Sequence, residues 1–213
     1  MENVLLGKWL QVRYAFFHWR QELSSTKKLF LALSMAGVTG LMAQIYIPLP
    51  FTPVPITGQV FGALLSGVIC GGLFGAISQG IYVCLGILGL PWFAGAKGGL
   101  NIIGDPTIGY LIGFIFSAFI IGKLTDRKIG NRKFLSQFGL MIIGVIIIYG
   151  FGAMGLAVVI HSGLKETLIK GVLPFIGVDL IKSCFAAGIS SSILPKASYN
   201  EEVDKDLYSS NKY

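Results

Sequence analysis

The chain has 213 residues, of which 54% are hydrophobic and 13% are charged, and its formal net charge is +7. Soluble domains carry about a quarter charged residues, whereas no Asp, Glu, Lys or Arg occurs here between Leu29 and Ala96. This composition excludes an ordinary soluble domain and predicts an integral membrane protein. The basic residues stand in short clusters beside apolar runs, which is typical of membrane topology signals and not of a nucleic-acid-binding surface.

Residues 1–28 precede the first long apolar run and have a different pattern. Apolar side chains recur at alternating steps of four and three residues, at Leu5, Trp9, Val12, Phe16, Trp19 and Leu23. This spacing predicts one face of an amphipathic helix. Tryptophans on the apolar side and arginines on the polar side favour a helix that lies in the interface of an anionic leaflet. A poorly ordered terminus with a chance periodicity is the alternative.

Six apolar runs follow, at about residues 29–47, 56–70, 72–88, 106–122, 134–160 and 171–194. A helix needs about 20 apolar residues to cross a bilayer, so the sequence predicts an all-α polytopic bundle of six transmembrane helices over residues 29–195, followed by a polar tail, 196–213. With six crossings the basic N-terminal segment, the loop 123–133 and Lys196 lie on one side of the membrane. The positive-inside rule then places both termini in the cytoplasm of a multi-pass protein in the cell membrane.

The first span carries small residues at four-residue steps, Ala32, Ala36 and Gly40. Such a ladder lets the backbone of another helix approach closely. The approaching helix belongs either to a partner protein or to this same bundle, and the sequence leaves both interpretations open.

A proline-rich loop follows the first span, with Pro48, Pro50, Pro53 and Pro55. Proline at this density excludes a helix and favours an extended or turn conformation. The loop contains no charge, so it either lies at the interface or folds over the bundle with Phe51 pointing inwards.

A glycine-rich stretch, 89–105, lies on the same side and is the expected place of a ligand. It contains Lys97, which is followed directly by Gly98 and Gly99. Glycines let the backbone come close to a ligand and expose its N–H groups, and the lysine adds a positive charge.

The last span contains two opposite charges, Asp179 and Lys182, three residues apart and therefore on one side of a helix. Asp179 lies about 12 Å from the outer end, at about 1.5 Å per residue. A charge at such depth costs about 2.5 kcal/mol or more, so these residues are expected to face the bundle interior and to serve a function. A mutual ion pair that locks two helices together is the alternative.

These polar groups define a class of ligand. Lys97 or Lys182 would meet a carboxylate, and Asp179 would accept hydrogen bonds from N–H donors. An apolar body would be covered by the aromatic residues Tyr82, Trp92 and Phe93. Gln59 is either a ligand contact or a hydrogen-bonding link within the bundle. A small molecule with an acid at one end and an amide-like group at the other fits this set.

The sequence gives little support to an enzyme or to a metal protein. The segment GAKGGLN lacks the GxxxxGK[ST] spacing of a phosphate-binding loop, so ATP hydrolysis by this chain is not expected. Cys70, Cys84 and Cys184 lack the spacing of a metal site, and neither a metal nor a cofactor is predicted. His161 beside Ser162 indicates an interfacial turn more than a catalytic pair.

Three motifs, PLPFTPVPITGQ, GLPWFAGAKGGLNIIGDPTIGYLIGF and GVDLIKS, occur in this order and resemble the BioY family, the biotin-binding S subunits of energy-coupling-factor transporters. The similarity covers about residues 29–195. It implies a six-helix membrane protein that binds biotin from outside, between the first loop, the third loop and the last helices. It also implies a transmembrane coupling subunit and two cytoplasmic ATPases as partners, with Ala32 and Ala36 as the docking site of the coupling subunit.

The resemblance assigns roles to single residues. Asp179 matches the family aspartate that takes the ureido group, Lys182 matches the lysine beside it, and Gly98 and Gly99 match the glycine pair of the third loop. Lys97 stands where asparagine can occur, and we assign it to the ligand carboxylate as a hypothesis.

Two further positions depart from the family pattern. Leu111 stands where arginine can follow the Gly-Tyr pair, and Asp105 stands where a glycine is usual. A self-sufficient biotin carrier, or an S subunit for another small carboxylate vitamin, is the alternative function.

Overall fold

The computed structural model describes residues 2–195, without the side chains of residues 2–8, 10 and 129. The predicted polar tail, 196–213, lies outside the described residues. The elements in chain order are α1 (Glu2–Glu22), α2 (Ser25–Ala43), β1 (Tyr46–Ile47), β2 (Ile56–Thr57), α3 (Gln59–Cys70), α4 (Gly72–Ile87), the 3-10 helix η1 (Leu100–Gly104), α5 (Ile108–Arg127), the 3-10 helix η2 (Ile129–Arg132), α6 (Phe134–Ile160), α7 (Leu164–Gly171), the 3-10 helix η3 (Leu173–Phe175) and α8 (Ile176–Ile193). The prediction of an all-α protein is confirmed.

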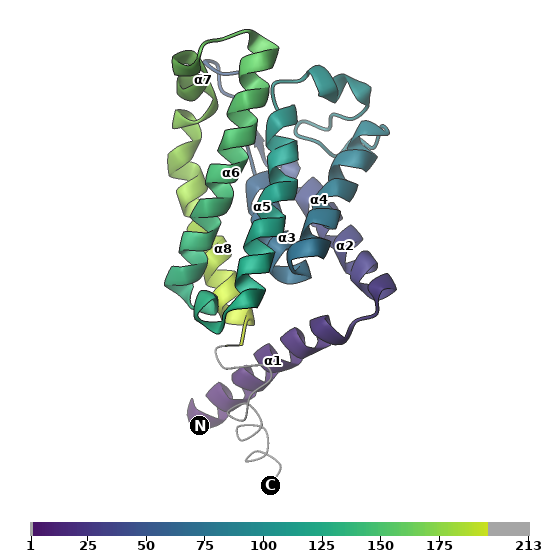
Figure 1. The fold of residues 1–213 in the computed structure, drawn as a ribbon, viewed down its shortest axis with the longest axis vertical. Coiled ribbons are helices and arrows are strands. Elements are labelled where there is room, and N and C mark those ends of the chain that lie inside the picture. The colour runs from purple at the N-terminus through teal and green to yellow at the C-terminus, as the bar shows by residue number, and fades with distance from the viewer. Residues whose placement is uncertain (1, 196–213) are drawn as a thin grey trace.

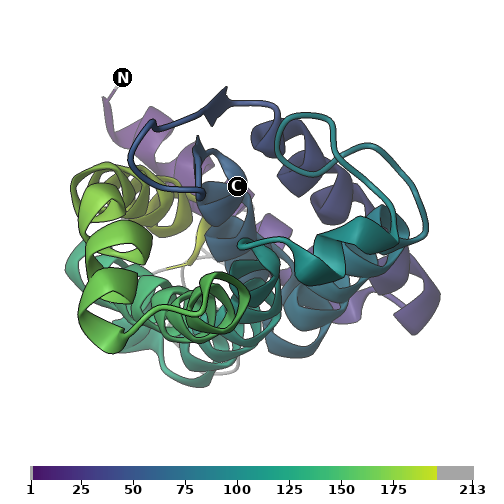
Figure 2. The ribbon, with the colours of Figure 1, turned by 90° about the horizontal axis from the view of Figure 1, so that it is seen from above.

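Helices α2 to α6 and α8 form one bundle, and α1 crosses one end of it (Figure 1). The turns around β1 and β2, the η1 segment and α7 lie at the opposite end, where Figure 2 looks onto them. Three stretches of the described chain are long and apolar enough to cross a membrane, namely Ile108–Arg127, Phe134–Ile160 and Leu164–Ile193. Helices α3 and α4 are apolar but shorter. The number of six crossings therefore stays a prediction.

The limits of several helices differ from the predicted spans. Helix α2 covers Ser25–Ala43 where 29–47 was predicted, and α8 begins at Ile176 where the last span was predicted from residue 171. The predicted fifth span, 134–160, is confirmed by α6. Helix α5 continues past the predicted end at Gly122, and its last turn contains the buried Thr125, whose hydroxyl accepts a hydrogen bond of 3.1 Å from the amide of Gln137. The segment 161–170 was expected as a loop and contains α7 instead.

The ladder of small residues on α2 is buried within the bundle. Ala32 and Ala36 are 0% exposed, and a Cβ added at Gly40 would lie 3.0 Å from the indole ring of Trp92. Helix α2 packs against α3 and α4. Packing within the bundle, one of the two interpretations that the sequence leaves open, is therefore observed for these residues. Their role as a docking surface for a partner stays a prediction.

Helices α5 and α6 approach each other closely at glycines. A Cβ added at Gly109 would lie 2.3 Å from the carbonyl oxygen of Phe151 and 3.0 Å from the Cα of Gly155. These contacts are to backbone atoms, which cannot rotate away as a side chain can. The close approach brings Tyr110 of α5 and Tyr149 of α6 to the walls of the same cavity.

Gly109→Ala is expected to destabilise the folded chain by about 1–3 kcal/mol, the usual effect of overpacking in a rigid interior. The control is Gly150→Ala, because Gly150 is an exposed residue of α6 with no atom within 4 Å of its added Cβ. Thermal unfolding of the purified proteins in detergent measures both changes. An equal effect of the two substitutions would contradict the close packing of α5 on α6.

Candidate ligand-binding site

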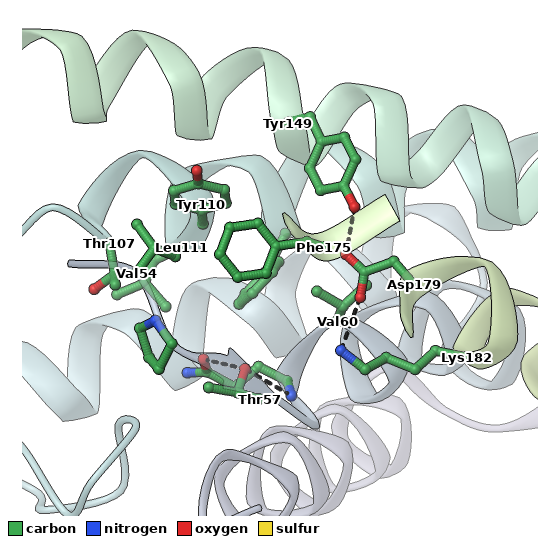
Figure 3. A pocket seen from close by; sticks show the side chains of 13 residues that line it. Val54, Thr57, Val60, Thr107, Tyr110, Leu111, Tyr149, Phe175, Asp179 and Lys182 are labelled. Atoms are coloured by element: carbon green, nitrogen blue, oxygen red, sulfur yellow. Dashed lines mark hydrogen bonds and ion pairs between the residues drawn. The ribbon is translucent and has the colours of Figure 1, made fainter. Parts of the chain in front are cut away.

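A buried ion pair on α8 forms the centre of the site. Lys182 Nζ donates to Asp179 Oδ1 at 2.7 Å, and the hydroxyl of Tyr149 on α6 donates to Asp179 Oδ2 at 2.7 Å. The side chain of Asp179 is 3% exposed and that of Lys182 is 16% exposed. The predicted inward orientation of the pair is thus confirmed, and Figure 3 shows both donors directed at the carboxylate.

The carboxylate of Asp179 keeps capacity for further donors. An ionised carboxylate has about four acceptor positions, and the two hydrogen bonds from Tyr149 and Lys182 use one on each oxygen. Lys182 in turn has three N–H donors and uses one of them on Asp179. The pair can therefore receive a ligand group that donates to the carboxylate and accepts from the ammonium, as a urea or amide does.

The walls of the cavity around the pair are mainly apolar and aromatic. They come from the proline-rich loop, α3, α5, α6, η3 and α8, and consist of Val54, Pro55, Thr57, Gln59, Val60, Thr107, Tyr110, Leu111, Phe114, Tyr149, Phe175, Asp179 and Lys182. The free volume is about 40 Å³, whereas pockets for organic ligands hold about 300–1,000 Å³. A ligand larger than a few waters requires the covering segments to move outwards.

The proline-rich loop covers this cavity and is tied down on its far side. The hydroxyl of Thr52 donates to the carbonyl of Lys170 in α7 at 2.7 Å and accepts from the backbone N–H of Val54 at 3.2 Å. Val54 and Pro55 then line the cavity. Phe51 is 59% exposed, so of the two predicted orientations of the loop, the one with Phe51 pointing inwards does not occur here.

A second hollow lies beside the first. It is lined by Tyr46, Pro53, Pro55, Gln59, Phe93, Ala94, Lys97, Ile102, Thr107 and Leu111. Four of these residues, Pro55, Gln59, Thr107 and Leu111, also line the cavity of Asp179. The structure thus places Lys97 in a neighbouring space, separated from Asp179 by a shared wall, and does not bring the two charges into one cavity.

Lys97 is held by Asp105, the residue for which the sequence offers no explanation. Lys97 Nζ donates to Asp105 Oδ2 at 3.0 Å, and the other carboxylate oxygen accepts from the backbone N–H and the hydroxyl of Thr107, at 2.9 Å and 2.7 Å. Burial alone would raise the pKa of Asp105, but the Thr107 hydrogen bonds and the Lys97 ammonium outweigh it, so the pKa is lowered. Asp105 closes the glycine-rich stretch onto the start of α5.

Asp105→Asn is expected to lower the unfolding temperature equally at about pH 7 and about pH 5. The folded pKa lies below the ordinary value of 3.8, so the stabilisation is fully present above 3.8 and is lost only as the pH falls through the lower folded value. Thermal unfolding of the variant and of the wild type across this range measures the difference. A difference that already shrinks between pH 7 and pH 5 would mean that the folded pKa is raised instead.

The remaining predicted contacts form a hydrogen-bonded chain behind the cavity. Thr57 donates to Gln59 Oε1 at 2.9 Å, Gln59 Nε2 donates to the hydroxyl of Tyr82 at 2.6 Å, and this hydroxyl donates to the carbonyl of Trp92 at 3.3 Å. Gln59 lines the cavity, but Tyr82 is 0% exposed, and neither Tyr82 nor Trp92 is among the cavity walls. Gln59 is therefore a hydrogen-bonding link within the bundle and also one of the residues that line the cavity.

The glycine pair has a structural use in the loop. Gly99 has a φ of +96°, which favours glycine, and its N–H donates to the carbonyl of Gly86 at 2.7 Å. A Cβ added at Gly98 would lie 2.6 Å from the carbonyl oxygen of Leu90. The N–H of Gly99 thus points into the protein, against the expectation that the pair exposes N–H groups to a ligand.

Tyr149 is the site residue that the sequence analysis did not select. A signal was present, since Tyr149 is the one side chain able to donate a hydrogen bond between Leu140 and Ile160. A hydroxyl in such an apolar span requires a partner inside the bundle, and here the partner is Asp179.

Comparison with known proteins decides the family. A family model described as the BioY family matches residues 18–198. The chain belongs to the BioY family. A crystal structure of the S-component for biotin from an ECF-type ABC transporter aligns with a TM-score of 0.71 and 28% identity over 79% of this chain and 93% of that one.

Curated relatives named as BioY proteins show higher identity than this crystal structure. A protein of Methanothermobacter thermautotrophicus named probable biotin transporter BioY is 43% identical over 147 residues, which is 66% of this chain and 94% of the relative. The protein of Thermotoga maritima named biotin transporter BioY is 38% identical over 162 residues, 76% of this chain and 89% of the relative. These relatives are named as transporters and not as enzymes.

Proposed function

We propose that this chain is the biotin-binding membrane subunit of a biotin uptake system. The observation that carries the proposal is the buried Asp179 carboxylate, which faces a mainly apolar cavity with acceptor capacity left beside the Lys182 ammonium. The ureido group of biotin has two N–H donors and one carbonyl acceptor, which complement this pair. The relatives named as biotin transporters and the aligned S-component for biotin support the same ligand.

The uptake system includes a transmembrane coupling subunit and two cytoplasmic ATPases. This chain lacks the sequence pattern of an ATP-binding loop, so the ATP hydrolysis of such a system belongs to partner proteins. The aligned S-component belongs to an ECF-type ABC transporter, which supports this assembly.

The chain divides into an interfacial segment, 1–28, a six-span domain, 29–195, and a cytoplasmic tail, 196–213. The spans are α2, α3, α4, α5, α6 and α8, and both termini lie in the cytoplasm. The exposed basic residues Lys123, Arg127, Lys128 and Lys133 lie in the last turns of α5 and in its connection to α6. They support this orientation, because that connection lies at the end of the bundle that α1 crosses (Figure 1). The ligand cavity then opens towards the outside.

Equilibrium binding of radiolabelled biotin to the purified chain in detergent tests the ligand. We expect saturable binding that unlabelled biotin displaces and that an unrelated small acid, such as nicotinate, does not. No saturable binding of biotin, together with saturable binding of radiolabelled nicotinate, would favour an S subunit for another carboxylate vitamin. Uptake by cells that lack coupling subunits and their ATPases would favour a self-sufficient carrier.

Lys97→Ala is expected to weaken the binding of biotin but not that of biotin methyl ester, because the ester has no negative charge for the ammonium to meet. The side chain of Lys97 is 59% exposed, so a ligand carboxylate could reach its ammonium beside Asp105. The measurement is competition of both ligands against radiolabelled biotin on the wild type and on the variant. Unchanged discrimination between acid and ester in the variant would remove Lys97 from the carboxylate site.

A further inference from the structure

Helix α1 is attached to the bundle by one side, which we call the docked side and which consists of Arg13, Phe17 and Arg20. All three residues are 5% exposed or less. Arg13 Nε donates to the carbonyl of Leu194 at 2.8 Å, beyond the end of α8. Arg20 Nη1 donates to the carbonyl of Val68 near the end of α3 at 2.7 Å. The prediction that these arginines meet an anionic leaflet is therefore wrong.

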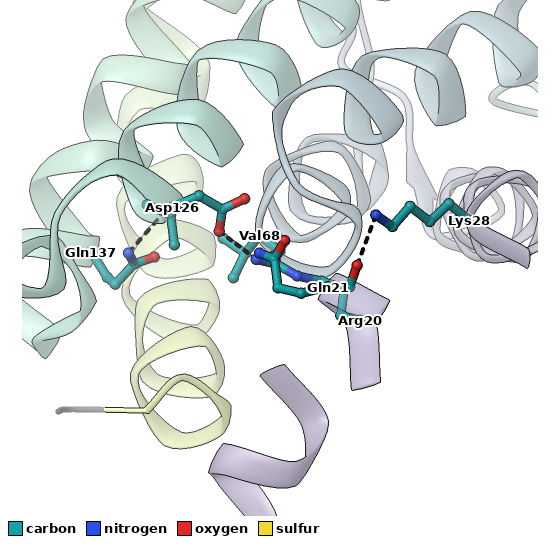
Figure 4. Close-up of polar contacts among 7 residues, drawn as sticks. Arg20, Gln21, Lys28, Val68, Asp126 and Gln137 are labelled. Atoms are coloured by element: carbon teal, nitrogen blue, oxygen red, sulfur yellow. Dashed lines mark hydrogen bonds and ion pairs between the residues drawn. The ribbon is translucent and has the colours of Figure 1, made fainter. Parts of the chain in front are cut away.

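The arginines donate to carbonyl groups at the ends of bundle helices. The last carbonyls of a helix have no partner within it and carry partial negative charge, so a cation there is favourable. Arg20 also pairs with Asp126 in the last part of α5, as Figure 4 shows. Two arginines of α1 thus hold the same-side ends of α3, α5 and α8.

A second side of α1, which we call the tryptophan side, consists of Trp9, Val12, Phe16 and Trp19. Trp9, Val12 and Trp19 are 49%, 56% and 48% exposed, and Phe16 is partly exposed. At about 100° per residue, the tryptophan side lies about a quarter turn from the docked side. With the docked side on the helix ends of the bundle, the tryptophan side therefore points sideways and not straight away from the bundle.

The position of the start of α2 indicates how deep α1 lies relative to the hydrocarbon core of the bilayer. Helix α1 ends at Glu22 and α2 begins at Ser25, while Leu29 and Phe30 on α2 are already exposed apolar residues. Four residues of helix advance about 6 Å, which matches the roughly 5–7 Å thickness of the polar interface on each side of the bilayer. The C-terminal part of α1 thus lies at the depth of the interface.

We propose that the tryptophan side of α1 lies in the phospholipid interface of the leaflet next to it, and that the bundle, not anionic lipid, holds it there. This leaflet is the cytoplasmic one if the chain has the orientation proposed above. The rest of the inference does not depend on that orientation. Indole rings favour the interface, where an apolar body and a polar N–H are both satisfied. Arg13 and Arg20 donate to protein groups, so their charges are not directed at phosphate head groups.

The chain offers a direct reporter, because its three tryptophans are Trp9, Trp19 and Trp92. In a Trp92→Phe variant all tryptophan fluorescence comes from α1. The variant is placed in nanodiscs of phosphatidylcholine, with or without phosphatidylglycerol, and is quenched either with brominated acyl chains or with aqueous iodide. The Trp9→Phe/Trp19→Phe variant, which reports only Trp92, is the matched control.

We expect brominated lipid to remove most of the α1 fluorescence, to the same extent with and without phosphatidylglycerol, and iodide to quench little. Strong quenching by iodide would show that water covers the tryptophan side. Quenching by neither agent would show that protein covers it, either residues 196–213 or a second copy of the chain. Quenching by brominated lipid that requires phosphatidylglycerol would show anchoring by anionic lipid. Each of these three results overturns the inference, and biotin binding by the wild type in the same nanodiscs tests the proposed function separately.

Discussion

Asp179→Asn is expected to weaken biotin binding about 30-fold to 1,000-fold, which corresponds to about 2–4 kcal/mol. The carboxylate is 3% exposed and accepts from both Lys182 and Tyr149. An amide keeps one acceptor oxygen but turns the other acceptor into a donor, so the Tyr149 hydroxyl or a ligand N–H then faces an NH₂ group. The loss of charge also leaves Lys182 without its partner. Equilibrium binding of radiolabelled biotin measures the change.

Glu166→Gln is the matched control for this substitution. Glu166 also pairs with a lysine, since Lys170 Nζ donates to its Oε1 at 2.6 Å, but its side chain is 52% exposed. An exposed pair contributes about 0–1 kcal/mol, so this variant should bind biotin like the wild type. If Asp179→Asn also binds biotin like the wild type while it remains folded, Asp179 is not part of the ligand site. Its role would then be structural, as the acceptor that joins α8 to Tyr149 of α6. If Asp179→Asn binds biotin weakly but shows no unfolding transition, the variant is not folded. Tyr149→Phe then takes its place in the experiment, because it removes one donor to Asp179 and keeps the charge.

The helices could be predicted because their signals are local. The range 134–160 matches α6 at both ends, since Lys133 and His161 interrupt an otherwise apolar run. The pairing of Asp179 with Lys182 could also be predicted, because a three-residue spacing on one helix places both side chains together. Helix α7 was missed because it is short and its charged residues resemble those of a loop.

The errors concern which neighbour a side chain meets. Small residues on α2 predict close packing, and the structure shows close packing against the chain's own elements, but the sequence could not name those elements. Arginines on α1 predict a polar side, and the structure turns Arg13 and Arg20 to helix ends that lie far away in sequence. Asp105 has no explanation in the sequence because its partners, Lys97 and Thr107, meet it only in the folded loop. Periodicity gives the side of a helix, whereas the partner depends on the assembled bundle.

Arg20→Met is expected to destabilise the folded chain by about 3 kcal/mol. The substitution leaves the carbonyl of Val68 without this donor and the carboxylate of Asp126 without its cation. Removing one partner of a fully buried pair costs about 3–5 kcal/mol, and the lower end applies because the Asp126 side chain is 29% exposed. Thermal unfolding in detergent measures the loss, with Arg127→Met as the control, since this change removes the same charge from an exposed position on α5.

A double-mutant cycle with Asp126→Asn separates the ion pair from the loss of the long side chain. If the pair carries the effect, the two changes together should cost clearly less than the sum of the single changes. Additive costs would mean that the contact of Arg20 with Val68 and its position 4.5 Å from the ring of Phe17 carry the stability instead. In both cases an effect larger than that of Arg127→Met shows that α1 stabilises α3 and α5 from the end opposite to the cavity. Since Gln59 of α3 and Leu111 of α5 line that cavity, a segment outside the helix bundle then contributes to holding the walls of the candidate site in place.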